Sequence, residues 1–214
     1  MMLTIALAKG RLQDEALRLF AAAGVRLGDG ALNSRRLAIE DEEGRFRFIF
    51  VKPADVTVYV EHGIADCGVV GRDLLLETQA DVLQPLDLRV GGCRLAVAAK
   101  EGGPGLTRGM LHVATKYPRV AAAHFGARGV SVEIIELSGS VELAPVTGLA
   151  DCILDLVETG RTLAENGLVV TETVAESTAR LVVNRASYRL RSAEVGALID
   201  SLAAVVNGEG GGEA

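Results

Sequence analysis

A phosphate-binding loop is one interpretation of residues 148–167, which read GLADCILDLVETGRTLAENG. The apolar run 152–157 stops at Glu158-Thr159-Gly160-Arg161-Thr162, so hydroxyls, a glycine and an arginine follow a strand-like segment. Gly160 would let the backbone approach a ligand closely. The N–H groups at the start of a helix over 162–166 would face an anion along the helix axis.

The same loop also fits an ordinary strand-to-helix turn. Thr159 or Thr162 would then be the N-cap of the helix, and Asn166-Gly167 would be its C-cap. The spacing of a Walker A loop, with its Gly-Lys pair before Ser or Thr, is missing. Taken alone, the loop favours capping over phosphate binding.

Two aspartates, Asp151 and Asp155, accompany this apolar run. Their even spacing points both carboxylates to one side of a strand. A carboxylate inside so apolar a segment is costly unless a partner satisfies it. Asp155, near the carboxyl end, is well placed for the hydroxyls of a sugar, whereas Asp151 is better explained as a cap of the turn after Gly148.

Two further turns contain residue types that bind anions. Ser138-Gly139-Ser140-Val141-Glu142 joins a predicted strand to a predicted helix, and Lys9-Gly10-Arg11 directly follows the first predicted strand. Each also has a plain explanation, with Ser140 as an N-cap and the basic segment as a solvated turn. More positive charge in the first half comes from Ser34-Arg35-Arg36, Lys52 and Arg72.

Composition restricts the class of protein. The chain has 214 residues, 49% of them hydrophobic and 23% charged, which is ordinary for a globular protein with a substantial core. The net charge of -6 argues against a protein that coats nucleic acid, although a local positive pocket is compatible with it. The amino terminus meets charge too early for a signal peptide, and no run reaches the roughly 18–20 apolar residues of a membrane span. We therefore expect a cytoplasmic protein with neither nucleic-acid nor membrane partners.

The cysteines and histidines do not form a metal-binding pattern. Cys67, Cys93 and Cys152 are scattered without C-x-x-C spacing, which fits buried thiols in a reducing compartment. His62, His112 and His124 have no ligand spacing either. No structural zinc site is expected.

Strand-like and helix-like segments alternate along the chain, which predicts an α/β architecture with largely parallel sheets. The predicted helices cover 13–23, 53–62, 72–77, 118–126, 140–146, 162–166 and 192–206. The predicted strands cover 3–8, 37–40, 46–51, 65–71, 82–88, 94–100, 112–115, 130–137, 152–157, 169–174 and 179–183.

The pattern G-[IL]-A-D-C occurs twice, at 63–67 and at 148–152. Both copies follow a predicted helix and lead into an apolar strand. The match is short enough to arise by chance, so coincidence and two similar α/β lobes are the alternatives. Two lobes would divide near residues 89–93, and the cleft between them would be a common place for a ligand.

Long segments of the chain resemble the signature of the ATP phosphoribosyltransferase family. Glu136-Leu137-Ser138-Gly139-Ser140-Val141-Glu142-Leu143-Ala144-Pro145 and the following Gly148-Leu149-Ala150-Asp151 match it. Asp155-Leu156-Val157-x-Thr159-Gly160-x-Thr162-Leu163-x-x-Asn166-Gly167-Leu168 continues the match. The segments ALAKGRL at 6–12 and GIADxGVVG at 63–71 agree as well, so the resemblance covers about residues 3–206.

The resemblance implies a two-lobe fold like that of the type II periplasmic binding proteins, with a central cleft. Lobe I would comprise 1–90 and be completed by about 176–207, lobe II would comprise 91–175, and 208–214 would be a disordered tail. The implied reaction transfers the 5-phosphoribosyl group of phosphoribosyl pyrophosphate (PRPP) to N1 of ATP, giving N1-(5-phosphoribosyl)-ATP and pyrophosphate. This glycosyl transfer is the first step of histidine biosynthesis, and Mg²⁺ would arrive on the substrates rather than in a protein cage.

The resemblance also implies roles for individual residues. Those expected to bind PRPP are Glu142, Asp155, Thr159, Gly160, Arg161 and Thr162, with the 5′-phosphate on Thr159–Thr162 and the ribose facing Asp155. Lys9, Gly10, Arg11 and Arg72 would lie near pyrophosphate or the ATP phosphates, and Lys9, Lys52 and Arg35 would act in catalysis.

Two positions depart from the family pattern. Lys52 and Thr57 stand where the family usually has arginine and proline. Lysine keeps the charge but lacks the fork with which arginine grips pyrophosphate. Arg35 therefore becomes the better candidate for contact with the leaving group.

The chain resembles the short form of the enzyme, because the regulatory carboxyl-terminal domain of the long form is missing. That form pairs with a regulatory subunit similar to histidyl-tRNA synthetase, and a homo-oligomer is expected too. The alternative function is a non-catalytic small-anion-binding module of the same fold, because one fold can host unrelated functions.

Overall fold

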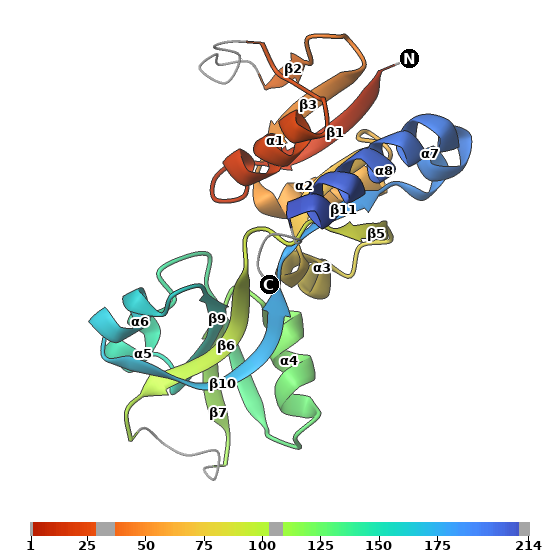
Figure 1. The fold of residues 1–214 in the computed structure, drawn as a ribbon. Coiled ribbons are helices and arrows are strands. Elements are labelled where there is room, and N and C mark those ends of the chain that lie inside the picture. The colour runs from red at the N-terminus through yellow and green to blue at the C-terminus, as the bar shows by residue number, and fades with distance from the viewer. Residues whose placement is uncertain (1, 29–36, 103–108, 210–214) are drawn as a thin grey trace. The chain divides into compact units, whose positions relative to one another are not determined.

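The computed structural model describes residues 2–28, 37–102 and 109–209 (Figure 1). The chain divides into two compact units. Unit 1 contains the residues up to Gly91 and those from Thr178 onward, and unit 2 runs from Gly92 to Ser177. The chain therefore passes from one unit to the other after Gly91 and again after Ser177.

Unit 1 is built on a sheet with the strand order β2-β3-β1-β4-β11-β5. Its strands are β1 (Leu3–Ala8), β2 (Ala38–Glu40), β3 (Phe46–Val51), β4 (Cys67–Gly71), β5 (Leu83–Asp87) and β11 (Ala179–Val183). Its helices are α1 (Gln13–Ala22), α2 (Pro53–Glu61), α3 (Arg72–Thr78), α7 (Arg185–Leu190) and α8 (Ser192–Glu209).

The alternation of side chains along β1 explains the layers of unit 1. Leu3, Ile5 and Leu7 point into a core shared with α1 and α8. Ala6 and Ala8 point the other way, into a core shared with α2 and α3. Because successive side chains of a strand face opposite sides, this one strand anchors helices on both faces of the sheet.

A glycine in β4 lets α2 pack close to the sheet. A Cβ at Gly68 of β4 would lie 2.8 Å from Val56 and 2.9 Å from Val60, both on α2. Any side chain at this position would therefore push the helix away. The glycine fits its place in the strand because another element approaches the backbone closely there.

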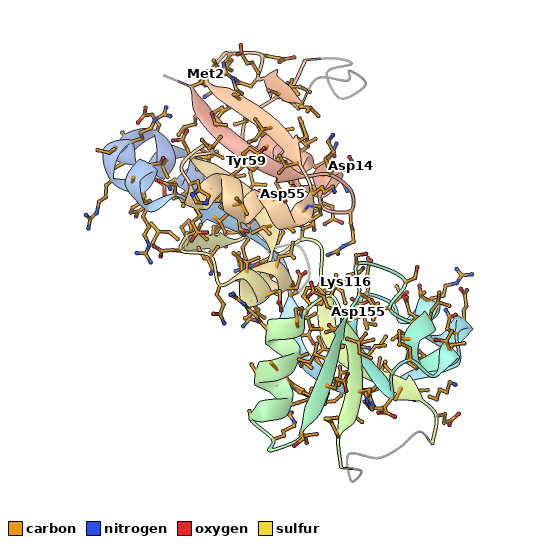
Figure 2. The ribbon with its side chains drawn as sticks, turned by 180° about the vertical axis from the view of Figure 1, so that it is seen from behind. Met2, Asp14, Asp55, Tyr59, Lys116 and Asp155 are labelled. Atoms are coloured by element: carbon orange, nitrogen blue, oxygen red, sulfur yellow. The ribbon has the colours of Figure 1, made fainter. Side chains whose placement is uncertain are left out.

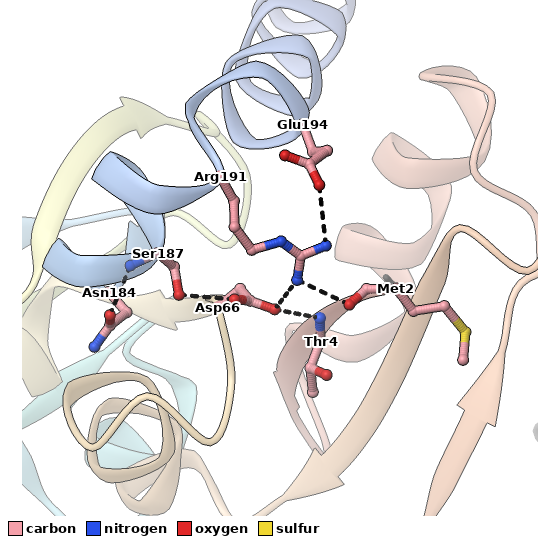
Figure 3. A network of polar contacts seen from close by, with 7 residues as sticks. All are labelled: Met2, Thr4, Asp66, Asn184, Ser187, Arg191 and Glu194. Atoms are coloured by element: carbon pink, nitrogen blue, oxygen red, sulfur yellow. Dashed lines mark hydrogen bonds and ion pairs between the residues drawn. The ribbon is translucent and has the colours of Figure 1, made fainter.

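A polar network joins the amino end of β1 to the carboxyl-terminal helices of unit 1 (Figure 3). Asp66 Oδ2 accepts hydrogen bonds from the Thr4 N–H at 2.8 Å and from Arg191 Nη1 at 3.0 Å. The Ser187 hydroxyl donates to Asp66 Oδ1 at 2.7 Å. Asn184 caps α7 by accepting from the N–H groups of Ala186 and Ser187.

Unit 2 contains a sheet with the strand order β10-β6-β9-β7-β8. Its strands are β6 (Cys93–Lys100), β7 (Leu111–Thr115), β8 (Val132–Glu136), β9 (Cys152–Val157) and β10 (Leu168–Ser177), and its helices are α4 (Pro118–Gly126), α5 (Leu143–Thr147) and α6 (Arg161–Glu165). Residues of α5 and α6 share a core with alternate residues of β6 and β9, among them Ala144, Leu163, Ala96 and Ile153.

The carboxylate of Asp151 stands at the start of β9 and binds the neighbouring strand. Its Oδ2 accepts from the His112 N–H of β7 at 2.8 Å. Its own N–H donates to the His112 carbonyl at 2.9 Å. The prediction that Asp151 caps the turn after Gly148 is therefore wrong.

Both sheets are mixed, and the prediction of largely parallel sheets is wrong. β1 is parallel to β3 and β4, and β7 is parallel to β8 and β9. The other five pairings, β2 with β3, β11 with β4 and β5, and β6 with β9 and β10, are antiparallel.

The predicted elements differ from the observed ones mainly at their ends. Helix α7 was not predicted, although Asn184 is a good N-cap, and α8 continues to Glu209 beyond its expected end at 206. Part of the predicted tail is thus helical, and residues 210–214 lie outside the described residues. In the described ranges, each helix is too short or too polar to cross a membrane.

Candidate functional site

The carboxyl ends of three parallel strands meet at one edge of the unit 2 sheet. Thr115 of β7 lies opposite Glu136 of β8 and opposite Leu154 of β9. The Thr115 hydroxyl donates to the Leu154 carbonyl and accepts from the Tyr117 N–H, which fixes this edge. Residues 137–142 and 158–160 both leave the sheet here, so the two predicted anion-binding turns arise from one edge.

Asp155 lies next to this edge and is 9% exposed. Its Oδ1 accepts from the Leu156 N–H at 2.8 Å. It shares a face of β9 with Ile153 and Val157, whose side chains belong to the core under α5 and α6. A partly accessible carboxylate on this face is suited to bind hydroxyl groups.

The loop after β9 has an N-cap of an unexpected kind. Gly160, with φ of 78°, occupies the N-cap position of α6 and provides no side-chain cap. The Thr159 hydroxyl accepts from the Arg161 N–H over a long distance of 3.4 Å, which makes a weak hydrogen bond. Thr162 lies inside the helix. The interpretation of Thr159 or Thr162 as the N-cap is therefore wrong.

Two N–H groups of the same loop are available to an anion. Within the described residues, no acceptor binds the N–H groups of Gly160 and Thr162.

The C-cap prediction for the same helix is confirmed. Asn166 is the C-cap of α6, and its side chain donates to the Thr162 carbonyl at 2.8 Å. Gly167 follows with φ of 68°, a conformation that favours glycine.

Arg161 is exposed and points along its own helix. Its Nε contacts Glu165 Oε1 at 2.9 Å, and its side chain is 84% accessible. Exposed pairs of this spacing are worth about 0.3–0.5 kcal/mol. An anion at the loop could therefore displace Glu165 at little cost.

The turn before α5 has a strained backbone. Ser140 has φ of 47°, a left-handed conformation that is uncommon outside glycine. It is therefore not the N-cap that was predicted, and α5 begins at Leu143 with Glu142 as its N-cap residue. Glu142 is half-buried at the same edge as Asp155. Strain of this kind occurs often at ligand-binding sites.

Basic residues gather at the corresponding edge of the unit 1 sheet. Lys9 follows β1 directly, and its N–H donates to the carbonyl of Val51, the last residue of β3, at 2.9 Å. Lys52 is the N-cap residue of α2, and Arg72 is the first residue of α3 after β4. Because β3, β1 and β4 are parallel neighbours, the structure brings these three cations to one edge.

The turn Gly10-Arg11 joins this group. Gly10 has φ of 103°, which strongly favours glycine. Arg11 Nη1 donates to the Gly91 carbonyl at 2.9 Å. Arg35, the other predicted catalytic cation, lies outside the described residues.

The cysteines are poor nucleophiles. All three are free and buried. Burial, more than the neighbouring aspartates Asp66 and Asp151, raises the pKa of Cys67 and that of Cys152 to about 12 each. These two thiols therefore stay protonated at neutral pH.

Sequence reasoning missed Lys116, which the structure places beside Asp155 (Figure 2). Lys116 follows Thr115, and Asp155 follows Leu154, its partner on the adjacent parallel strand. Lys116 is exposed. The sequence did contain a signal for Lys116. A lysine between an apolar strand and Pro118, which starts the next helix, must lie at the edge of the sheet where the carboxyl ends of the strands meet.

Comparison with known proteins identifies the family. Residues 52–204 match the family model of HisG, ATP phosphoribosyltransferase. The ATP phosphoribosyltransferase of Geobacillus kaustophilus is 51% identical over 96% of this chain and 99% of the relative, and that of Bacillus subtilis is 48% identical over 97% of both.

Solved structures agree with this match. A chain of the ATP phosphoribosyl transferase (HisG:HisZ) complex from Thermotoga maritima has a TM-score of 0.85 and 34% identity, covering 96% of this chain and 99% of that one. The periplasmic aliphatic sulphonate binding protein SsuA of Escherichia coli shares the fold, with a TM-score of 0.62 and 13% identity over 96% of this chain and 72% of its own. The periplasmic-binding-protein-like fold is thereby confirmed. The chain belongs to the ATP phosphoribosyltransferase family, in its short form, and its reaction is the first step of histidine biosynthesis.

Proposed function

We propose that the edge of unit 2 binds the phosphoribosyl part of PRPP. The backbone and hydroxyls of Thr159, Gly160 and Thr162 hold the 5′-phosphate, together with Arg161 once it leaves Glu165. Asp155 accepts hydrogen bonds from the ribose hydroxyls. The observation that supports this assignment most is the group of acceptor-free N–H donors next to a partly buried carboxylate.

Glu142 belongs to the same proposed site. It lies at the start of α5, directly after the strained turn at Ser140. From there its carboxylate contacts either a ribose hydroxyl or the metal that accompanies the substrate. Both uses need an acceptor oxygen, which the side chain provides.

The basic edge of unit 1 receives the pyrophosphate and the phosphates of ATP. Lys9, Lys52 and Arg72 supply charge there, and the Gly10-Arg11 turn supplies backbone and a guanidinium. In this proposal Lys9, Lys52 and Arg35 stabilise the leaving pyrophosphate. Lysine at position 52 does so as a point charge rather than as a fork.

The chemistry needs positioning and charge more than a protein nucleophile. Adenine N1 attacks the anomeric carbon, the bond to pyrophosphate breaks, and positive charge develops on the ribose ring. Fixed cations stabilise the leaving group, and the carboxylate of Asp155 stabilises the ring. The protonated thiols of Cys67 and Cys152 take no part.

Mg²⁺ fits this site as a companion of the substrate. Among the described residues, no group of three or more His, Cys, Asp or Glu side chains could hold a metal. Single carboxylates such as those of Glu142 and Asp155 are hard oxygen ligands of the kind Mg²⁺ accepts beside phosphate oxygens and water. Mg²⁺ would neutralise phosphate charge there.

A regulatory subunit similar to histidyl-tRNA synthetase is the proposed partner, together with a second copy of this chain. The support is that the Thermotoga maritima chain, matched over 99% of its length, comes from a HisG:HisZ complex. We place the protein in the cytoplasm, where reducing conditions keep its three free thiols reduced.

The test mixes the purified chain with ATP, PRPP and Mg²⁺, with and without the regulatory subunit, and measures phosphoribosyl-ATP. Product formation that requires both substrates is the expected result. PRPP binding without product in either condition would favour the alternative, a non-catalytic anion-binding module.

A further inference from the structure

Arg94 lies at the same sheet edge as the proposed phosphate loop. It is the second residue of β6 and stands opposite Val157, the last residue of β9 before that loop. Ala96, two residues further along β6, stands opposite Asp155. Because paired residues of antiparallel strands share a face, Arg94 and Asp155 are on the same face of the sheet.

The guanidinium of Arg94 has no partner within the described residues. The side chain is half-buried, and Nε is inaccessible and without a hydrogen bond. Glu176, directly opposite on β10, does not bond to it. Burying a guanidinium without a counter-ion is costly, so an unpaired one is unusual in a stable fold.

The other arginines of comparable position have carboxylate partners. Arg180 of β11 also has a buried Nε without a hydrogen bond, but its Nη2 is 2.9 Å from Asp87 Oδ2. In unit 2, Arg128 pairs with Glu172. Among the residues that the structure describes, the cation of Arg94 thus lacks the counter-charge that these arginines have.

We propose that the counter-charge of Arg94 is the 5′-phosphate of PRPP, which makes Arg94 a substrate-binding residue. This proposal rests on the proposed PRPP site. The fold keeps the guanidinium half-buried at the base of the loop, and the phosphate supplies its counter-charge. Charge-assisted bonds of this kind are short and strong, and arginine forms them in pairs.

The experiment measures PRPP binding to the purified chain with Mg²⁺ by titration calorimetry. Arg94→Met removes the charge but keeps the length of the side chain, and it should raise the Kd for PRPP by about tenfold or more. Arg94→Lys should fall between wild type and Arg94→Met, since lysine keeps the charge without the fork. The affinity for ATP alone should change less than about twofold in both variants.

Arg180→Met is the matched control, and thermal unfolding without ligand is the second readout. Arg94→Met should leave the Tm without ligand unchanged or raise it, whereas Arg180→Met should lower it by removing the ion pair with Asp87. Unchanged PRPP affinity in Arg94→Met, or a loss of apo stability equal to that of Arg180→Met, would overturn the proposal. A wild-type chain that binds no PRPP would instead refute the proposed function itself.

Discussion

The two copies of the G-[IL]-A-D-C pattern perform the same task in different units. Asp66 and Thr4 exchange backbone and carboxylate hydrogen bonds, and Asp151 and His112 do the same, with each carboxylate accepting at 2.8 Å. Gly63 and Gly148 precede them with φ of 70° and 79°. The repeat is therefore structural: each copy locks the start of one strand onto its parallel neighbour.

The copies differ in what surrounds the aspartate. Asp66 also binds Ser187 of α7 and Arg191, which lies between α7 and α8 (Figure 3), and its side chain is 15% accessible. Asp151 contacts the half-exposed ring of His112 at 3.1 Å, and its side chain is 32% accessible. Unit 1 has thus used this position to attach its carboxyl-terminal helices.

The strands that follow differ at their carboxyl ends. β4 is buried throughout and ends at Gly71, whereas β9 has Asp155 at the position that corresponds to Val70. The amino ends of the repeated strands therefore hold the fold together, while the carboxyl end of β9 carries the candidate chemistry. Four predictions test this difference.

The largest expected effect is on stability. Asp66→Ala should lower the free energy of unfolding by about 3 kcal/mol, because it removes the carboxylate that pairs with the partly buried Arg191 and accepts from Ser187 and from the Thr4 N–H. Asp151→Ala should cost about 1 kcal/mol, the worth of a hydrogen bond. Urea unfolding measures both. Equal losses would show that the helices add nothing to the Asp66 network.

Asp155→Asn should lower kcat/KM for PRPP roughly 100-fold. The hydrogen bonds between the carboxylate and the ribose hydroxyls become stronger as positive charge develops on the ribose ring in the transition state. Asp151→Asn is the matched control at the other end of the same strand, and its kcat/KM should stay close to wild type. Steady-state kinetics with PRPP as the varied substrate gives the comparison. An Asp155 variant as active as the control would remove the role assigned to this edge.

Thr162→Ala should weaken PRPP binding about tenfold and ATP binding much less, since it removes one phosphate contact. Thr147→Ala is the control, because its hydroxyl donates to the Leu143 carbonyl of its own helix. Calorimetric titration of both variants with PRPP and with ATP measures the two affinities separately. Equal weakening of both ligands by Thr162→Ala would support a role in stability instead.

The smallest effect concerns the cysteines that end the two patterns. Burial raises the pKa of Cys67 and of Cys152 to about 12, from 9.0. The stability that this shift contributes is complete below pH 9 and is lost as the pH rises toward 12, because the unfolded thiols ionise first.

Between pH 8 and 10, wild type should therefore lose roughly 1 kcal/mol more unfolding free energy than Cys67→Ala or Cys152→Ala. Urea unfolding at both pH values provides the measurement. Both substitutions should act alike, since both thiols are buried. Labelling of either thiol in the native protein at pH 8 would contradict their assigned protonation.

Local patterns predicted most of the elements. The hairpin of β2 and β3 follows from the alternation of apolar and polar residues, and the start of α2 follows from the fixed φ of Pro53. The C-cap of α6 follows from the chemistry of Asn166 and Gly167. All three signals act over a few residues. The match to the family signature likewise needed only the order of residues. The candidate loop at Thr159–Thr162 was found this way.

Other features depended on distant parts of the chain. No local signal indicates the directions of β10 and β11 or the left-handed Ser140. Nor does one indicate that Arg94 has no partner among the described residues. Asp151 was misread as a turn cap because its true partner, His112, is 39 residues away.

The class of fold, the family and the candidate phosphate loop could all be read from the sequence, because short-range periodicity and residue order encode them. Strand pairing and strand direction became known from the folded chain. The folded chain also showed which copy of the G-[IL]-A-D-C pattern holds the carboxyl-terminal helices and which leads to Asp155. These features depend on burial and on hydrogen bonds between residues that folding brings together, such as Thr4, Asp66 and Arg191.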